Sequence, residues 1–209
     1  PRLLTLYVEE HLQHLIDRNH MKHITQQHKA VEDRVHIGHL LETVKHPSDV
    51  RLLDDKQLEK LCSEIRHTLI DTVASTGGHL ASNLGTVELA VALETVYDTA
   101  KDRLVFDVGH QSYVHKMLTG RQAEFDHLRQ FGGMAGFPKP SESEADAFVA
   151  GHASSSVSIA LGMARARTLQ KQNYNVIALI GDGACTGGMA YEGMNDAAAS
   201  GEPMIVILN

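Results

Sequence analysis

Two polar residues stand at the ends of short apolar runs late in the chain. In the segment 177–209, IALIGDGACTGGMAYEGMNDAAASGEPMIVILN, Asp182 follows one run and Asn209 follows the next. If both runs are parallel strands, their carboxyl ends share one edge of the sheet and the two side chains face one crevice. Carboxylate, amide and phosphate oxygens together make the octahedral set that suits Mg²⁺. The spacing therefore predicts a site for Mg²⁺ and a diphosphate.

The residues around Asp182 suit such a site. Gly181 and Gly183 permit a tight turn and the close approach of a ligand, and a helix expected to start near Gly187 offers backbone N–H groups to an anion. We expect Asp182 to be a buried carboxylate that a diphosphate would repel unless a cation lay between them. Gly-Asp-Gly by itself also marks ordinary turns, so the prediction depends on the strand, helix and strand around it.

Two histidines lie where side chains reach a cleft. His79 belongs to the Gly-rich stretch GGHLAS, and His110, in DVGHQ, follows an apolar run. An imidazole donates to phosphate or moves protons near neutral pH, so both are candidates for acid–base work. The alternative is that each histidine is structural and hydrogen-bonded within the fold.

Residues 1–38 differ from the rest and are interpreted as a His-rich helical extension of unknown role. His11 with His14, and His20 with His23, have the i, i+3 spacing of a metal pair on a helix, but a solvated polar helix explains them equally. We expect the extension to be dispensable for folding.

The elements that must position these residues alternate between helix and strand. Periodicity predicts helices over 55–74, 87–98, 111–120, 157–170 and 187–199, with Asp54 or Asp55 and Thr86 as N-caps and Gly120 closing the third. It predicts strands in 103–110, 175–180 and 204–208, and loops over 75–86 and 131–146. Such alternation is typical of an α/β fold, a parallel sheet with helices on both faces that binds ligands at the carboxyl ends of its strands.

Composition excludes several function classes. The chain has 209 residues, 43% of them hydrophobic, and a net charge of −7 without an acidic or basic block, which gives no footprint for nucleic acid or an anionic membrane. The longest apolar runs are far shorter than the about 20 residues of a membrane helix. Two distant cysteines, Cys62 and Cys185, indicate a reducing compartment, and we expect a cytoplasmic protein.

Four long segments, in order, carry a family resemblance: GGHLASNLGTVELAVALETVYD, FDVGHQSYVHKMLTGR, SESEADAFVAGHASSSVSIALGMA and GDGACTGGMAYEGMNDA. They resemble the amino-terminal domain of the 1-deoxy-D-xylulose-5-phosphate synthase family, which are transketolase-like thiamine-diphosphate enzymes. The resemblance starts at about residue 40 and implies that 39–209 is a thiamine-diphosphate-binding domain.

The resemblance also implies roles for single residues. His110 would contact the cofactor, and His79 would face its reactive carbon, so both would transfer protons. Asp182 would bind Mg²⁺. Main-chain and side-chain contacts to the cofactor would come from Gly151, His152, Ala153, Gly183 and Ala184.

The family implies a reaction and partners. Pyruvate and D-glyceraldehyde 3-phosphate would condense with loss of CO₂ to 1-deoxy-D-xylulose 5-phosphate. This reaction would be the first step of non-mevalonate isoprenoid synthesis, and its product would also supply thiamine synthesis. The full-length enzyme would be a homodimer. The second metal ligand would lie two positions beyond Asn209, so we expect the 209-residue chain to be part of a longer enzyme and inactive alone.

Two acidic features have two possible roles each. Glu192 would be a buried interface acid or an exposed helix residue. The acidic segment 141–144 would be a solvated loop or part of the substrate channel.

Two alternatives stay open at this point. One is the matching domain of a transketolase, against which GHASSS and DVGHQSYVHKMLTGR argue, and the other is a non-catalytic fragment that only dimerises or binds cofactor.

Overall fold

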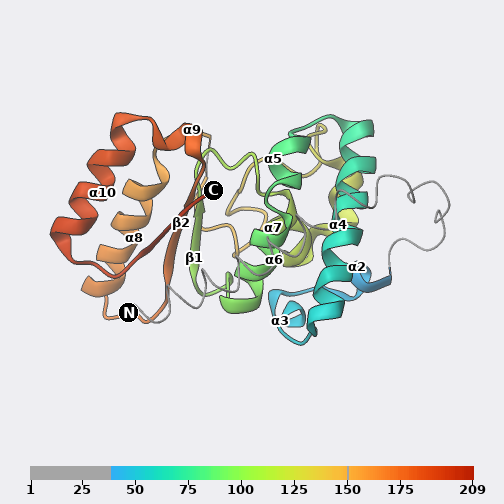
Figure 1. Ribbon diagram of the computed structural model, residues 1–209, viewed down its shortest axis with the longest axis horizontal. Coiled ribbons are helices and arrows are strands. Elements are labelled where there is room, and N and C mark those ends of the chain that lie inside the picture. Colours follow the sequence, from blue (N-terminus) through green and yellow to red (C-terminus); the bar gives the residue numbers. More distant parts are fainter. Residues whose placement is uncertain (1–38, 150) are drawn as a thin grey trace.

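The three predicted strands form one parallel sheet in the computed structural model, which describes residues 39–149 and 151–209 (Figure 1). The order is β1 (Arg103–Phe106), β2 (Val176–Ile180) and β3 (Ile205–Leu208), with β2 in the centre. Two register pairs, Arg103 with Val176 and Ile177 with Ile205, bring the carboxyl ends of all three strands to one edge. The predicted extension 1–38, with its histidine pairs, lies outside the described residues.

Helices precede, connect and follow these strands. Their bounds are α2 (His39–Thr43), α3 (Pro47–Val50), α4 (Asp55–Thr76), α5 (Leu80–Leu84), α6 (Val87–Val96), α7 (Tyr113–Lys116), the π-turn η1 (Met117–Arg121), the 3₁₀ turn η2 (Gln122–His127), α8 (Ser156–Leu169), α9 (Asp182–Cys185) and α10 (Gly188–Ser200).

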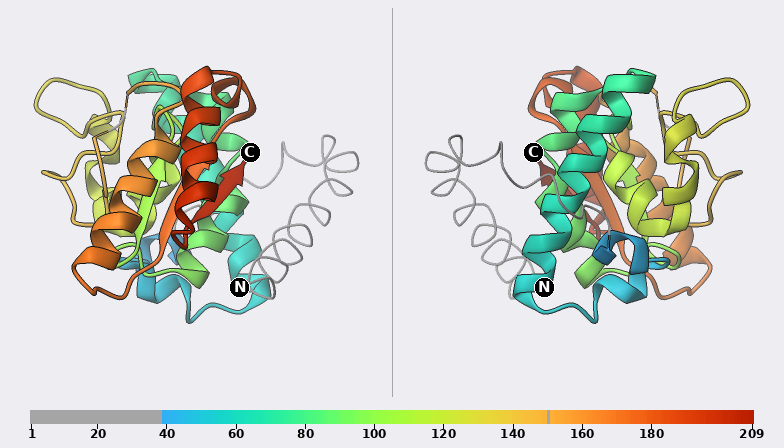
Figure 2. Two further views of the ribbon diagram at one scale, coloured as in Figure 1. Left: turned by 90° about the vertical axis from the view of Figure 1, so that its left-hand side faces the viewer. Right: turned by 90° about the vertical axis from the view of Figure 1, so that its right-hand side faces the viewer.

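The sheet has helices on both faces, as predicted. Successive strand residues point to opposite sides. Phe106 and Leu179 accordingly pack with Leu93 of α6, whereas Val105 and Ala178 belong to the cluster formed with α8 and α10. Figure 2 shows α8 and α10 on the opposite side of the molecule from the long helix α4.

Helix α4 starts where its cap predicts. Asp54 Oδ1 accepts a hydrogen bond from Gln57 N at 2.9 Å, and Gln57 Oε1 accepts one from Asp54 N at 2.9 Å, which satisfies two otherwise unpaired N–H groups. Its apolar face, including Leu61 and Leu69, is buried against α6 and α7. The predicted helix 55–74 is confirmed and ends two residues later, at Thr76.

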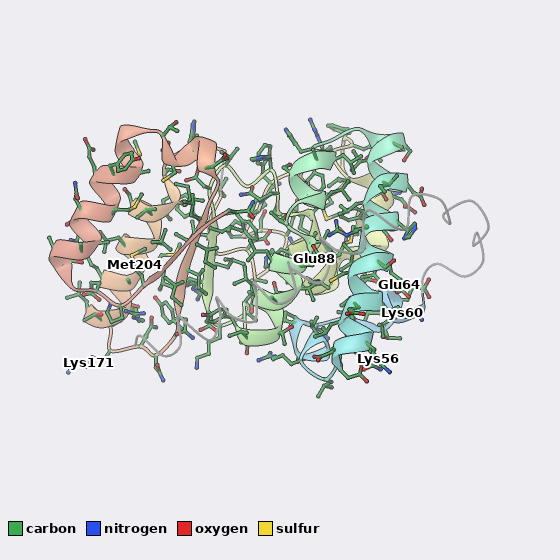
Figure 3. The ribbon with its side chains drawn as sticks, viewed as in Figure 1. Lys56, Lys60, Glu64, Glu88, Lys171 and Met204 are labelled. Carbon is green, nitrogen blue, oxygen red and sulfur yellow. The ribbon has the colours of Figure 1, made fainter. Side chains whose placement is uncertain are left out.

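Polar contacts attach α4 to its neighbours. The buried Glu64 accepts hydrogen bonds from the backbone N–H groups of Leu40 and Leu41 at 3.1 and 2.7 Å, and so holds the start of α2 (Figure 3). Arg66 pairs with Glu88 of α6. These contacts make α2, α4 and α6 one packed unit beside the sheet.

One prediction about these elements is wrong. The expected loop 75–86 contains the short helix α5, because Leu80 and Leu84 pack on the core. The expected helix 111–120 starts two residues late, at Tyr113, and its helical backbone ends at Thr119 and Gly120 as predicted: Gly120, at φ 88°, is left-handed, and an added Cβ would lie 2.6 Å from Lys45 O. The predicted strand 204–208 is confirmed as β3, and its Leu208 is 63% exposed because β3 is the edge strand of the described sheet.

Candidate functional site

The carboxyl ends of the strands bring Asp182 and Asn209 together, as predicted. Asp182 N donates to Asn209 O at 3.0 Å, and Asn209 N donates to Ile180 O at 2.9 Å. In Figure 1, α9, which begins at Asp182, follows the upper end of β2. The backbone thus holds the two polar residues side by side.

The burial expected for Asp182 is wrong. Its carboxylate is exposed, and Oδ1 accepts from the N–H of Gly183 at 2.7 Å. A Cβ built on Gly183 would meet nothing within 4 Å, so there is room beside this turn for a ligand. Asp182 therefore presents its charge to solvent at the end of β2 instead of to the protein interior.

A residue that the sequence did not single out, Asp107, organises the end of β1. It is 1% exposed, and its two carboxylate oxygens accept hydrogen bonds from Ser154 N at 2.8 Å and Ser156 N at 2.9 Å. Ser154 Oγ in turn donates to Ala184 O at 2.6 Å. Asp107 thereby fixes the start of α8, and Ser154 joins it to the turn that follows β2.

The predicted cofactor triplet lies in this linked region. Gly151, His152 and Ala153 are exposed in the turn just before Ser154. Gly151 has φ 151°, in the region that favours glycine, which explains its residue type without any ligand. The structure thus places the triplet next to Ala184 through the Ser154 contact.

Two non-glycine residues at this edge have left-handed backbones. Val108 has φ 58° and Ser154 has φ 68°. Such a conformation costs about 1–3 kcal/mol per residue and persists where its surroundings impose it. Here Asp107 O accepts from Gly109 N at 2.6 Å and from Gln111 Nε2 at 3.1 Å, which holds the turn that carries His110.

The structure brings the two predicted histidines into contact. The ring centroids of His79 and His110 are 5.3 Å apart at an interplanar angle of 66°, and the ring of Phe137 lies 6.3 Å from that of His79. His79 is exposed, whereas Nδ1 of His110 is buried without a hydrogen-bond partner in the described part of the chain. Burial lowers the pKa of His110, the nearby His79 lowers it further, and Asp107 opposes both effects.

Comparison with known proteins decides the family. The family model described as 1-deoxy-D-xylulose-5-phosphate synthase matches residues 41–209. The chain belongs to the 1-deoxy-D-xylulose-5-phosphate synthase family. Among its relatives of that name, the Parabacteroides distasonis protein is 52% identical over 174 residues, which are 83% of this chain and 28% of the relative. The Pelotomaculum thermopropionicum protein is 56% identical over 173 residues, 83% of this chain and 27% of the relative.

The synthase-family chain also shares its fold with solved transketolases. The Campylobacter jejuni transketolase matches with a TM-score of 0.66 and 23% identity over 75% of this chain and 28% of that one. The Leishmania mexicana transketolase matches with a TM-score of 0.62 and 22% identity over 72% of this chain and 27% of that one. These likenesses confirm the α/β fold class, and the chain spans little more than a quarter of its relatives' length.

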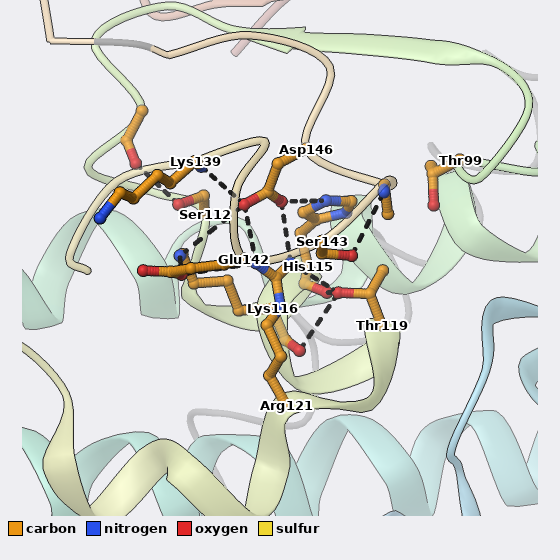
Figure 4. Close-up of polar contacts among 12 residues, drawn as sticks. Thr99, Ser112, His115, Lys116, Thr119, Arg121, Lys139, Glu142, Ser143 and Asp146 are labelled. Carbon is orange, nitrogen blue, oxygen red and sulfur yellow. Dashed lines mark hydrogen bonds and ion pairs between the residues drawn. The ribbon is translucent and has the colours of Figure 1, made fainter. Parts of the chain in front are cut away.

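A cluster of buried ion pairs joins the helices of this synthase-family chain to the loop that ends at residue 146 (Figure 4). Its members come from α6, α7, η1 and that loop: Glu94, His115, Lys116, Arg121, Glu142 and Asp146. His115 bridges Glu94 Oε1 at 2.7 Å and Asp146 Oδ1 at 3.2 Å. Arg121 donates to both oxygens of Asp146, at 2.7 and 2.8 Å. The cluster anchors the loop 139–146 to the helices.

The acidic segment 141–144 is only partly solvated, because Ser141 and Glu144 are exposed whereas Glu142 belongs to the cluster. Glu142 accepts from the buried Lys116 Nζ at 2.7 Å, and Lys139 N donates to Asp146 at 2.7 Å. Burial opposes charge, yet hydrogen bonds from His115 and Arg121 hold the pKa of Asp146 well below its usual range. Burial likewise opposes protonation of His115, but its bonds to Asp146 and Glu94 raise its pKa above the usual value.

The two cysteines and Glu192 take no part in the contacts described above. Cys62 and Cys185 are free, and burial, with Glu88 nearby, raises the pKa of the Cys62 thiol to about 12. Glu192 is exposed on α10. Within 39–149 and 151–209, no three His, Cys, Asp or Glu side chains are grouped so that they could hold a metal ion. None of the described helices is both long and apolar enough to span a membrane.

Proposed function

We propose that residues 39–209 are the cofactor-diphosphate domain of a 1-deoxy-D-xylulose-5-phosphate synthase. The full enzyme would condense pyruvate with D-glyceraldehyde 3-phosphate and release CO₂. One observation supports this function: the rings of His79 and His110 are in contact at the carboxyl edge of the sheet. At the same edge, hydrogen bonds of Asp107 and Ser154 connect the segment 151–156 to the Gly-Asp-Gly turn. That edge holds proton-transfer groups and diphosphate contacts together.

The residues present fit thiamine diphosphate and Mg²⁺. Asp182 offers an exposed carboxylate to the metal, and the space beside Gly183 admits phosphate oxygens near the backbone of Gly183 and Ala184. Gly151, His152 and Ala153, exposed in the adjoining turn, would contact the cofactor. When bound, the cofactor would supply a nucleophilic ylid carbon and a thiazolium ring that takes up the electron pair released on decarboxylation.

The histidines would move the protons. The lowered pKa of His110 favours a neutral ring at pH 7, and its buried, unpartnered Nδ1 is an atom that a bound cofactor would satisfy. His79, exposed beside it, would exchange protons with substrate oxygens. The ring of Phe137 lies edge-on to that of His79, at a centroid distance of 6.3 Å.

The wider setting is part of the same proposal. We expect a cytoplasmic homodimer when the protein has the length of its relatives, acting at the first step of isoprenoid precursor synthesis and supplying thiamine synthesis. The two free cysteines suit a reducing compartment.

Asp182→Asn in the full-length protein tests the proposal. Removing the anionic metal ligand should weaken the Mg²⁺-dependent binding of thiamine diphosphate about 10- to 100-fold. Calorimetric titration with and without Mg²⁺ measures this change. Asp196→Asn, which removes an equal charge from an exposed site on α10, is the control and should bind normally.

Turnover distinguishes the enzyme classes. The unmodified full-length protein should convert pyruvate and glyceraldehyde 3-phosphate, and should not use a ketose donor such as xylulose 5-phosphate. Undiminished cofactor binding by Asp182→Asn would remove the Gly-Asp-Gly turn from the mechanism. Transfer from the ketose donor alone would indicate a transketolase.

A further inference from the structure

A single buried side chain connects the backbones of the two histidines. Asn83 of α5 is 0% exposed, and its Nδ2 donates to His79 O at 2.7 Å and to His110 O at 2.8 Å. Its Oδ1 accepts from Tyr113 N at 2.9 Å. Both donors of the amide and its carbonyl oxygen are therefore in use.

The bonds of Asn83 link segments that are distant in sequence. His79 is the residue before α5, whereas His110 follows β1 and lies 27 positions beyond Asn83. Two other polar contacts join the stretch around α5 to the stretch after β1, and both are longer: His79 N donates to the Tyr113 hydroxyl at 3.4 Å, and Thr86 Oγ1 donates to Gln111 O at 3.5 Å. The 5.3 Å separation of the two rings thus depends mainly on the amide of Asn83.

We propose that Asn83 is a positioning residue that sets the distance and angle between the His79 and His110 rings. Its amide donates to both histidine carbonyls at once, and an apolar side chain of the same size would remove this donor from His110 O and leave His79 O only the longer bond from Ser82 Oγ, at 3.4 Å. The inference rests on the proposed proton-transfer roles of the two histidines, and it names the residue that makes them act as a pair.

The first test uses the unmodified chain. Nuclear magnetic resonance should show scalar couplings across hydrogen bonds from Asn83 Nδ2 to the carbonyl carbons of His79 and His110, and slow solvent exchange of its amide protons. Cross-relaxation should connect the ring protons of the two histidines. Fast exchange of the Asn83 amide and absent couplings would overturn the proposal without any variant.

The second test replaces the amide without changing the charge. In Asn83→Leu, which keeps the volume, and in Asn83→Ala, the cross-relaxation between the rings should fall several-fold. The midpoint of the His110 titration should rise, because separation from His79 removes one cause of its lowered pKa while Asp107 stays in place. Unchanged ring contacts and an unchanged midpoint in a folded variant would show that Asn83 only stabilises the core.

A control separates positioning from general loss of stability. Thr99→Val removes another buried side-chain hydrogen bond, from Thr99 Oγ1 to Glu94 Oε2 at 2.8 Å, away from the histidine segments. It should leave the ring contacts and the His110 midpoint unchanged. If it moves them as much as Asn83→Leu does, the effect is nonspecific and the proposal fails.

Activity completes the test. In the full-length enzyme, Asn83→Leu should lower kcat about 10²-fold, the size of effect expected from displacing a reacting group by about 1 Å, with cofactor affinity changed much less. Displaced rings with normal turnover would support the positioning role and contradict the proposed role of the histidines. Undisplaced rings would contradict the positioning role whatever the turnover.

Discussion

Removing the charge of Asp146 should destabilise the fold strongly. Asp146 is 3% exposed and accepts hydrogen bonds from both terminal nitrogens of Arg121, from His115 and from Lys139 N. Asp146→Asn keeps the shape but replaces one acceptor oxygen with an NH₂ group among these donors. Arg121, His115 and Lys116 would then share the carboxylates of Glu94 and Glu142 alone.

The expected size follows from burial. Breaking a buried ion pair by removing one partner typically costs about 3–5 kcal/mol, because the remaining charge stays in the interior without compensation. We expect Asp146→Asn to lower the free energy of unfolding by about that amount. This is a large part of the about 5–15 kcal/mol that stabilises a typical domain.

The chain contains a matched control. Asp196 forms the same two-bond pair with Arg165, at 3.0 and 2.6 Å, but its side chain is 54% exposed. Water solvates the separated charges there, so Asp196→Asn should hardly move the urea midpoint. Urea unfolding followed by circular dichroism at pH 7 compares the two variants. Equal shifts, or a loss below about 1 kcal/mol for Asp146→Asn, would refute an energetic role for the buried cluster.

Two further predictions concern pH and the start of α8. The raised pKa of His115 means that its stabilisation is fully present below its unfolded pKa of about 6.5 and is lost as the pH rises through its folded pKa, so stability should fall above neutrality. His115→Gln should lack this decrease in urea unfolding at a series of pH values, and an identical pH dependence would contradict the assignment. Asp107→Ala should lower stability by about 2–6 kcal/mol, since two buried N–H groups each lose an acceptor at about 1–3 kcal/mol. Amide exchange at Ser154 and Ser156 should accelerate with it, and unchanged protection of both would show that Asp107 does not hold this turn.

The sequence predicted the elements whose signals are local. The strands in 103–110 and 175–180 and helix 55–74 were correct because a run of apolar residues, or their recurrence at three and four positions, reflects burial of the segment itself. The prediction failed for 75–86, where Leu80 and Leu84 are too few to give a periodic pattern and only packing on the core makes α5 helical.

For the candidate site, too, the sequence predicted some features and not others. The spacing correctly predicted that Asp182 and Asn209 meet at the carboxyl edge of the sheet, whereas the metal, the diphosphate and the proton-transfer roles of His79 and His110 stay predictions. The exposure of Asp182 could not be predicted, because it depends on what packs beyond β3.

Only the tertiary structure showed which distant backbone groups Asp107 and Asn83 contact. An aspartate directly after a strand gave a weak signal, but its bonds join residues 47 and 49 positions away in the chain, and Asn83 gave no signal at all in a stretch expected to be a loop. The physical reason is that such contacts follow from strand register and helix packing. A local pattern specifies which face a residue buries, but it does not specify which distant carbonyl or N–H group that face will meet.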